Sequence, residues 1–222
     1  MIIFLSKDTL WGREAEKLVQ SFFLGECACF LGISGDPFPD LLKVKKNYVI
    51  LSFLSPWIVP KAVLDKADLA LNFHPGSTDY PGIGCYNFAL YEGAKCFGVV
   101  CHHMAPQVDR GAVVEERLFE ILPHESVETL KLRSMVELLS MFHGILGKIN
   151  ASTPLPKSDA QWTRKPFTRK QLDQLCEIAP EMDEAEVRRR VRATAYPGYP
   201  GAAENVPGAA ESAARPDREP FA

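Results

Sequence analysis

Short apolar runs alternate with stretches of helical spacing over the first 150 residues. The apolar runs predict buried strands, and apolar positions three or four residues apart predict amphipathic helices. Strands alternating with helices are typical of a largely parallel sheet with right-handed crossovers. The sequence therefore predicts an α/β fold with a Rossmann-like, mostly parallel sheet flanked by helices. The strands are expected at residues 2–5, 28–33, 48–53, 69–74, 98–104 and 113–121, and the helices at 9–23, 60–66, 87–92 and 126–149.

The pattern changes after the long helix expected at 126–149, whose apolar positions form one stripe. Residues 1–150 are predicted to form one catalytic domain. Residues 151–200 are polar and rich in proline, and they are expected to be a short C-terminal extension with helical pieces at 168–177 and 183–193. Residues 201–222 carry almost no large apolar side chains, so we expect a disordered tail.

Composition excludes few classes of protein, but it gives information about which kinds of partner the protein binds. The formal net charge is -3 over 222 residues, which gives no bulk electrostatic reason for a nucleic-acid or membrane partner. No stretch approaches the ~20 apolar residues that span a bilayer. The first residues read as a strand and not as a signal peptide, so the expected location is the cytoplasm.

The six cysteines lie mostly in apolar runs. Cys27 and Cys29 are two residues apart, which is not the spacing of a zinc knuckle or of a thioredoxin-like site. We therefore expect plain buried thiols, no disulfides and no bound metal.

The strongest candidate chemistry lies at the end of the strand expected at 69–74. Asn72 and His74 are two residues apart, so their side chains share one face, and Pro75 then stops the strand. In α/β proteins, side chains at this end of the sheet project into the binding crevice. Asn72 and His74 could both donate hydrogen bonds to an oxyanion. Asp109 could hold His74 in its protonated form or accept a proton from an amine.

A simpler interpretation stands beside this one. A His and an Asn at a strand end cap turns about as often as they catalyse, and the Asp-Arg-Gly sequence at 109–111 is typical of an ordinary turn. On their own, Phe53 and Trp57 are typical of a hydrophobic core. Nothing in the sequence supports a role for His103 or His124.

Six short motifs in order resemble the folate-dependent formyltransferases, which include glycinamide ribonucleotide, methionyl-tRNA and nucleotide-sugar enzymes. The motifs are Phe-Leu-Ser-Pro-Trp-Ile-Val at 53–59, Asn-x-His-Pro-Gly-Ser at 72–77, Asp-Tyr-Pro-Gly at 79–82, Ala-Leu-Tyr-Glu-Gly at 89–93, Gly-x-x-Cys-His at 98–102 and Asp-x-Gly at 109–111. The resemblance implies the formyltransferase fold and transfer of the formyl group of 10-formyltetrahydrofolate to a primary amine, without a metal.

The same resemblance implies roles for individual residues. Asn72, His74 and Asp109 match the family's catalytic Asn, His and Asp. The residues expected to contact the folate are Ser52, Phe53, Leu54, Val59, His102, Gln107 and Val108.

The resemblance leaves three acceptor amines open. Glycinamide ribonucleotide needs a phosphate cradle, but residues 6–12 contain no glycine cluster. Methionyl-tRNA needs an RNA-binding surface, but only residues 150–222 remain, and the basic run at 186–192 is more typical of a solvated helix face. Residues 162–167, 188–194 and 196–202 are similar to segments of nucleotide-sugar N-formyltransferases.

The sequence therefore favours formylation of a nucleotide-linked amino sugar used in surface polysaccharide, such as the O-antigen of lipopolysaccharide. The alternatives are a methionyl-tRNA formyltransferase-like enzyme, another amine formyltransferase, and a non-catalytic folate-binding module. Expected partners are the folate and the sugar nucleotide, with no nucleic acid and no membrane. Pairing into a homodimer through C-terminal elements is suggested by the resemblance alone.

Overall fold

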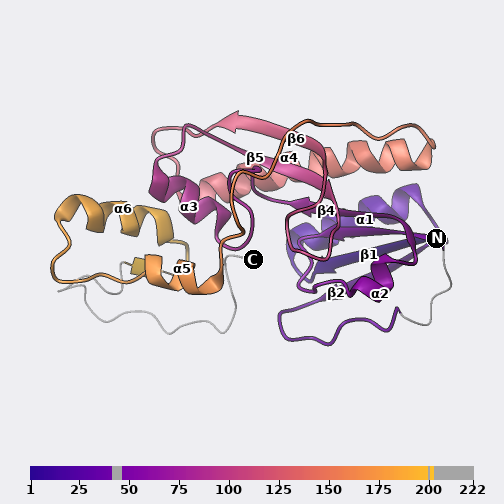
Figure 1. Cartoon of the computed structure of the whole chain (residues 1–222), viewed down its shortest axis with the longest axis horizontal. Coiled ribbons are helices and arrows are strands. Elements are labelled where there is room, and N and C mark those ends of the chain that lie inside the picture. The colour runs from indigo at the N-terminus through magenta and orange to yellow at the C-terminus, as the bar shows by residue number, and fades with distance from the viewer. Residues whose placement is uncertain (42–46, 200, 203–222) are drawn as a thin grey trace.

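A six-stranded sheet forms the centre of the molecule, with the strand order β2-β1-β3-β4-β5-β6 (Figure 1). A computed structural model describes residues 1–41, 47–199, 201 and 202. The strands are β1 (Ile2–Lys7), β2 (Cys27–Gly32), β3 (Tyr48–Phe53), β4 (Ala67–His74), β5 (Cys96–His103) and β6 (Val113–Glu120). The expected strands are all present, and the α/β fold is confirmed.

The sheet is parallel from β2 to β4 and antiparallel from β4 to β6. The prediction of a mostly parallel sheet therefore describes its first four strands. Only a loop at 104–112 joins β5 to β6, which is too short for the crossover that a parallel pair needs.

The helices of this part of the chain begin and end close to the predicted positions, and they are α1 (Leu10–Phe22), α2 (Lys61–Leu64), α3 (Cys85–Glu92) and α4 (Val127–Asn150). The side chain of Thr9 accepts the backbone N–H of Gly12 and so caps α1. Ser126 caps α4 in a reciprocal capping box with Thr129.

The helix α4 packs its apolar stripe against the sheet, as predicted. Phe142 is fully buried, and its ring lies 4.7 Å from that of Phe73 and 5.1 Å from that of Phe53, between ring centroids. Such contacts combine the burial of large apolar surfaces with favourable ring geometry. They fix β3 and β4, whose ends carry the candidate site.

The extension after α4 first runs as an irregular strap, residues 160–168, along the loop at 78–83. The backbone N–H of Ile83 donates to the carbonyl oxygen of Phe167 at 3.0 Å, and that of Phe167 donates to Pro81 at 2.9 Å. The ring of Phe167 stacks on Phe88 of α3 with 3.8 Å between centroids. This strap, an element that the sequence did not predict, joins the extension to the loop that follows β4.

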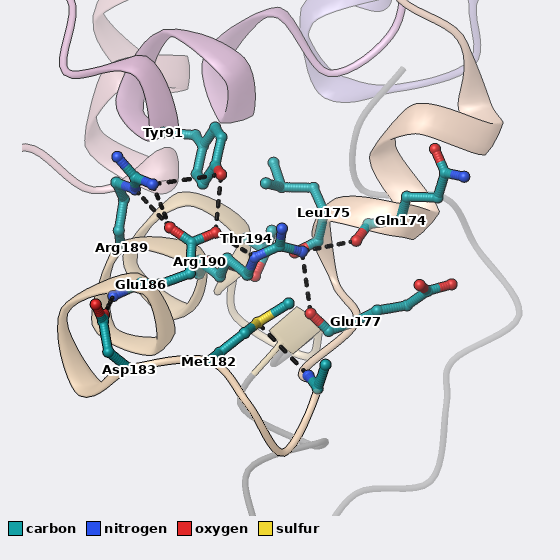
Figure 2. Close-up of polar contacts among 11 residues, drawn as sticks. Tyr91, Gln174, Leu175, Glu177, Met182, Asp183, Glu186, Arg189, Arg190 and Thr194 are labelled. Atoms are coloured by element: carbon teal, nitrogen blue, oxygen red, sulfur yellow. Dashed lines mark hydrogen bonds and ion pairs between the residues drawn. The ribbon is translucent and has the colours of Figure 1, made fainter.

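Two short helices follow the strap, α5 (Arg169–Leu175) and α6 (Glu184–Thr194), and α6 lies beside α3 (Figure 1). Figure 2 shows how Glu186 of α6 joins them. Its carboxylate accepts a hydrogen bond from the Tyr91 hydroxyl of α3 at 2.8 Å and pairs with Arg190 at 2.7 Å. Arg190 in turn donates to the carbonyl oxygens of Gln174 and Glu177 at the end of α5.

The basic run at 186–192 is therefore largely paired within the protein. Arg188 pairs with Glu184, Arg189 pairs with Glu186, and Arg192 donates to the carbonyl oxygen of Glu125 at 3.2 Å. These contacts agree with the interpretation of a helix face.

Two details of the sequence prediction need correction. Ala202 was expected to belong to a disordered tail, but it is buried and its N–H donates to the Thr194 hydroxyl at 2.9 Å. The rest of the predicted tail, residues 203–222, lies outside the described residues. Of the six free cysteines only Cys85 and Cys101 are buried, because Cys27 and Cys29 lie on the edge strand β2 and Cys96 begins β5.

Candidate active site

The candidate residues converge where β4 and β5 lie side by side. Asn72 and His74 are at the end of β4, and Asn72 pairs in register with His102 on β5. Asp109 lies in the loop between β5 and β6 with a φ of 45°, a left-handed conformation that Asp tolerates better than most residues. The four side chains line one cavity of about 470 Å³.

Asp109 is the centre of this group and is only 5% exposed. One carboxylate oxygen, Oδ2, lies 3.4 Å from His74 Nδ1 and accepts the backbone N–H of Gly82 at 2.8 Å. The other, Oδ1, lies 3.3 Å from His102 Nε2 and 3.4 Å from Asn72 Nδ2. A buried carboxylate needs such partners, because burial without them costs several kcal/mol.

These contacts decide the ionisation of Asp109. Burial raises the pKa of the carboxyl group, but the charge of His74 and the hydrogen bonds from His102 and Gly82 outweigh it. The net result is a pKa well below the ordinary value of 3.8. Asp109 is therefore an anion at neutral pH and a weak base.

The amide of Asn72 is held in one orientation. Its Oδ1 accepts the Ser52 hydroxyl at 2.7 Å, so its Nδ2 is turned toward His102 Nε2, 3.1 Å away, and toward Asp109. His102 Nδ1 faces the carbonyl oxygen of His103 at 2.8 Å, and its Nε2 lies between Asn72 Nδ2 and Asp109 Oδ1. Asn72 thus presents only N–H groups to this part of the cavity.

His74 has acceptors on both sides of its ring. Nε2 lies 2.9 Å from the carbonyl oxygen of Tyr80, and Nδ1 faces Asp109. A doubly protonated ring satisfies both contacts by donating twice. The expected hydrogen bond to an oxyanion would therefore come from Nδ1, since the loop after β4 occupies Nε2.

Trp162 of the strap covers the two histidines. Its indole N–H donates to the carbonyl oxygen of Gly111 at 2.8 Å. Its ring meets His102 edge to face, at 5.1 Å and 89°, and lies 6.1 Å from His74. The C-terminal extension thereby limits the access of water to the charged group.

The residues expected to contact a folate fall into two groups. Ser52, Leu54, Val59, His102, Gln107 and Val108 all line the cavity, together with Trp57 and Ile58 of the same loop. Phe53 does not line it. Its side chain points into the core against Phe142 because the alternation along β3 turns it away from the cavity.

Three contributors to the site escaped the sequence prediction: the Gly82 N–H, the Tyr80 carbonyl group and Trp162. Backbone groups carry no sequence signal of their own. Gly82 and Tyr80 lie in the Asp-Tyr-Pro-Gly motif, so the motif could have pointed to them, but only the fold shows what each of them contacts.

Within the described residues, no cluster of three or more His, Cys, Asp or Glu side chains could hold a metal ion. None of the helices in the described part is long and apolar enough to cross a membrane.

The fold and the site together define an α/β protein with the architecture of the formyltransferases. Residues 40–137 match the family model described as formyl transferase, which confirms the predicted resemblance. A phosphoribosylglycinamide formyltransferase from Haemophilus influenzae is 28% identical over 89 residues, or 40% of this chain and 42% of that protein. This match therefore spans less than half the length of that curated relative.

Solved structures extend the likeness over most of the chain. A protein from Mycobacterium tuberculosis superimposes with a TM-score of 0.72, 20% identity and 87% of each chain covered. An N-formyltransferase from Helicobacter canadensis, in complex with folinic acid and dTDP-3-aminofucose, gives a TM-score of 0.71 at 14% identity, with 87% of this chain and 80% of that chain covered. At these identities the likeness shows the fold.

Proposed function

We propose that this protein transfers the formyl group of 10-formyltetrahydrofolate to the primary amine of a nucleotide-linked amino sugar. The observation that carries the proposal is the buried Asp109 carboxylate, held by Asn72, His74 and His102 on the wall of a cavity large enough for a folate head group. The Helicobacter canadensis structure, with a folate and an amino-sugar nucleotide bound, supports the choice of substrates.

In this mechanism, the amine nitrogen attacks the formyl carbon and produces a tetrahedral intermediate with a negative oxygen. Asn72 Nδ2 donates to that oxygen, in place of its long contact with Asp109. His74 donates through Nδ1, and the Tyr80 carbonyl group keeps the ring oriented. Removing one such donor typically reduces the rate by about 10²–10³.

The charges of Asp109 and His74 determine how the proton moves as the leaving group departs. The bond between the formyl carbon and N10 of the folate breaks, and N10 gains a proton while the amine loses one. Because its pKa is so low, Asp109 is a poor acceptor for that proton. It acts as a fixed negative charge that stabilises protonated His74. His74 gives its Nδ1 proton to N10 as the bond to the formyl carbon breaks, and it then takes up the proton that the amine loses.

The walls of the cavity suit a pterin ring. Trp57, Ile58 and Val59 provide apolar surface, and Leu54 has a φ of 53°, which turns the chain sharply after β3. Flat apolar walls with a few polar backbone groups are typical of cofactor sites. In this proposal Gln107 and Val108 form the opposite wall.

A second candidate acceptor is phosphoribosylglycinamide. It is the compound in the name of the curated Haemophilus influenzae relative. The same catalytic group would serve it, since the reaction is again attack by a primary amine. The loop after β1 weakens this alternative, because residues 6–12 lack the glycine cluster of a phosphate cradle.

The proposal includes a role in surface-polysaccharide synthesis, such as that of lipopolysaccharide, and a cytoplasmic location. The buried charged group argues against a purely folate-binding module, which does not need one. Calorimetry with 5-formyltetrahydrofolate and candidate sugar nucleotides separates these hypotheses. Folate binding without any formyl transfer would support the module.

The catalytic group is tested by substitution. Asp109→Asn and His74→Ala are each expected to lower kcat by at least about 10², with saturating folate donor and amine. His124→Ala is the matched control, because His124 is exposed and does not line the cavity. Near-normal turnover by Asp109→Asn or His74→Ala would refute the assigned roles.

A further inference from the structure

Trp162 lies beside the catalytic histidines but does not line the cavity. It belongs to the strap at 160–168, which is fastened to the loop after β4 by the neighbouring residue. The backbone N–H of Thr163 donates to the carbonyl oxygen of Thr78 at 3.3 Å, and its hydroxyl group donates to Asp79 at 2.8 Å. Trp162 therefore reaches the site from the C-terminal extension without forming a wall of the space in which the substrates react.

The indole N–H of Trp162 holds the turn that carries Asp109. It donates to the carbonyl oxygen of Gly111 at 2.8 Å. Gly111 is buried, and an added Cβ would lie 1.6 Å from the carbonyl oxygen of His103, so the turn packs directly on the end of β5. Asp109 has a φ of 45°, a strained conformation that persists only where the surrounding structure holds it. The hydrogen bond from Trp162 is one of the contacts that hold it.

The indole ring of Trp162 also packs on His102. The two ring centroids are 5.1 Å apart and the ring planes meet at 89°, which is a favourable geometry for an aromatic pair. His102 Nε2 lies 3.3 Å from Asp109 Oδ1, and His102 Nδ1 faces the carbonyl oxygen of His103. Trp162 thus contacts both the turn that carries the carboxylate and one of the two imidazole rings that hold it.

We propose that Trp162 is a positioning residue, which the C-terminal extension supplies to keep the Asp109 carboxylate aligned with His74. The inference rests on the proposed function and deepens it, because it gives the extension a part in the rate of formyl transfer. Asp109 Oδ2 lies 3.4 Å from His74 Nδ1, which leaves little room for a longer separation. A misplacement of ~1 Å in a catalytic group can lower a rate about 10²-fold. A small shift of the turn therefore weakens the stabilisation of protonated His74.

The alternative is that Trp162 only helps to dock the extension. The extension has a separate contact of that kind at Tyr91 of α3, whose hydroxyl group donates to Glu186 of α6 at 2.8 Å (Figure 2). Tyr91 does not line the cavity. Tyr91→Phe is therefore the matched control for Trp162→Phe, because each variant keeps an aromatic ring and removes one donor between the extension and the rest of the chain.

Steady-state kinetics of the full-length protein separate the two roles. Trp162→Phe leaves the buried Gly111 carbonyl group without its indole donor, so kcat is expected to fall roughly ten- to a hundredfold. KM for the folate donor and for the acceptor should stay within about twofold, because no cavity wall is changed. Trp162→Leu, which removes the donor and the ring together, should lower kcat at least as much. Tyr91→Phe should retain the kcat and KM of the wild type.

Urea unfolding at neutral pH tests the contact without any formyl transfer. If Trp162 holds Asp109 in place, Asp109→Asn changes the urea midpoint less in the Trp162→Phe background than in the wild type, since part of the contribution of the carboxylate is already lost. In the Tyr91→Phe background the change should equal that in the wild type. Such a double-mutant cycle isolates the coupling between two side chains. The same transitions show whether each variant is folded.

The inference is overturned if Trp162→Phe retains the kcat of the wild type, if its loss appears in KM instead, or if Tyr91→Phe lowers kcat equally. It is also overturned if Asp109→Asn has the same effect on the urea midpoint in the wild type and in Trp162→Phe. A wild-type protein that transfers no formyl group to any acceptor would reject the proposed function, and the unfolding cycle alone would then decide whether Trp162 holds Asp109.

Discussion

At the scale of single residues, the site depends on one buried carboxylate. Asp109 is stabilised by charge from His74 and by N–H donors from Asn72 and Gly82. These partners come from distant parts of the sequence. Asn72, His74 and Asp109 could be predicted because each is a polar residue at the end of an apolar run or within an ordered motif.

The low pKa of Asp109 predicts how stability depends on pH. Because folding lowers this pKa, the carboxylate contributes stability above the unfolded value of 3.8, and the contribution is lost as the pH falls through the folded value. Urea unfolding of the wild type and of Asp109→Asn should give a constant difference between pH 6 and pH 5, of roughly 1–3 kcal/mol. The difference should shrink only at more acidic pH. A decrease already between pH 6 and pH 5 would contradict this assignment.

The sequence could not reveal the orientations that decide which atoms act. The sequence does not say which ring nitrogen of His74 faces a substrate, and that choice is made by the Tyr80 carbonyl group. Likewise Phe53 belongs to a motif that resembles a folate loop, yet its side chain packs in the core. Backbone contacts and side-chain direction follow from the three-dimensional arrangement of the strands and loops.

At the scale of elements, local pattern predicted the helices and strands well, whereas non-local pairing was missed. The capping residues Thr9 and Ser126 mark helix starts that are visible in the sequence. The antiparallel direction of β5 and the strap along the loop after β4 depend on contacts between distant segments. No local pattern carries that information.

The strap makes Gly82 a sensitive position. Gly82 has a φ of 85°, and an added Cβ would lie 2.4 Å from the carbonyl oxygen of Phe167. Gly82→Ala is therefore expected to destabilise the fold by more than about 2 kcal/mol and to lower kcat, because the Gly82 N–H also holds Asp109. Urea unfolding and steady-state kinetics measure the two effects.

Gly93→Ala is the matched control for that substitution. Gly93 has a similar φ of 67°, but an added Cβ meets nothing within 4 Å. Its replacement should cost about 1 kcal/mol from backbone strain alone and should leave kcat unchanged. Equal effects of the two substitutions would show that the contact between the loop and the strap does not support the site.

At the scale of the whole molecule, one cavity at the end of the sheet contains the catalytic group and the apolar loop after β3, and it shares lining residues with a smaller cavity. The C-terminal extension contributes to both spaces through Arg169 and Tyr196. We therefore expect the extension to influence which acceptor reacts as well as to support the catalytic group.

The most direct test of the central claim is a formyl-transfer assay with the full-length protein and 10-formyltetrahydrofolate. Acceptors are dTDP-, UDP- and GDP-linked amino sugars and phosphoribosylglycinamide, and tetrahydrofolate release is measured. The proposed function predicts release that depends on one of the sugar nucleotides and falls at least about 10²-fold in Asp109→Asn. Release that is absent with every amine, or unchanged in Asp109→Asn, would contradict it.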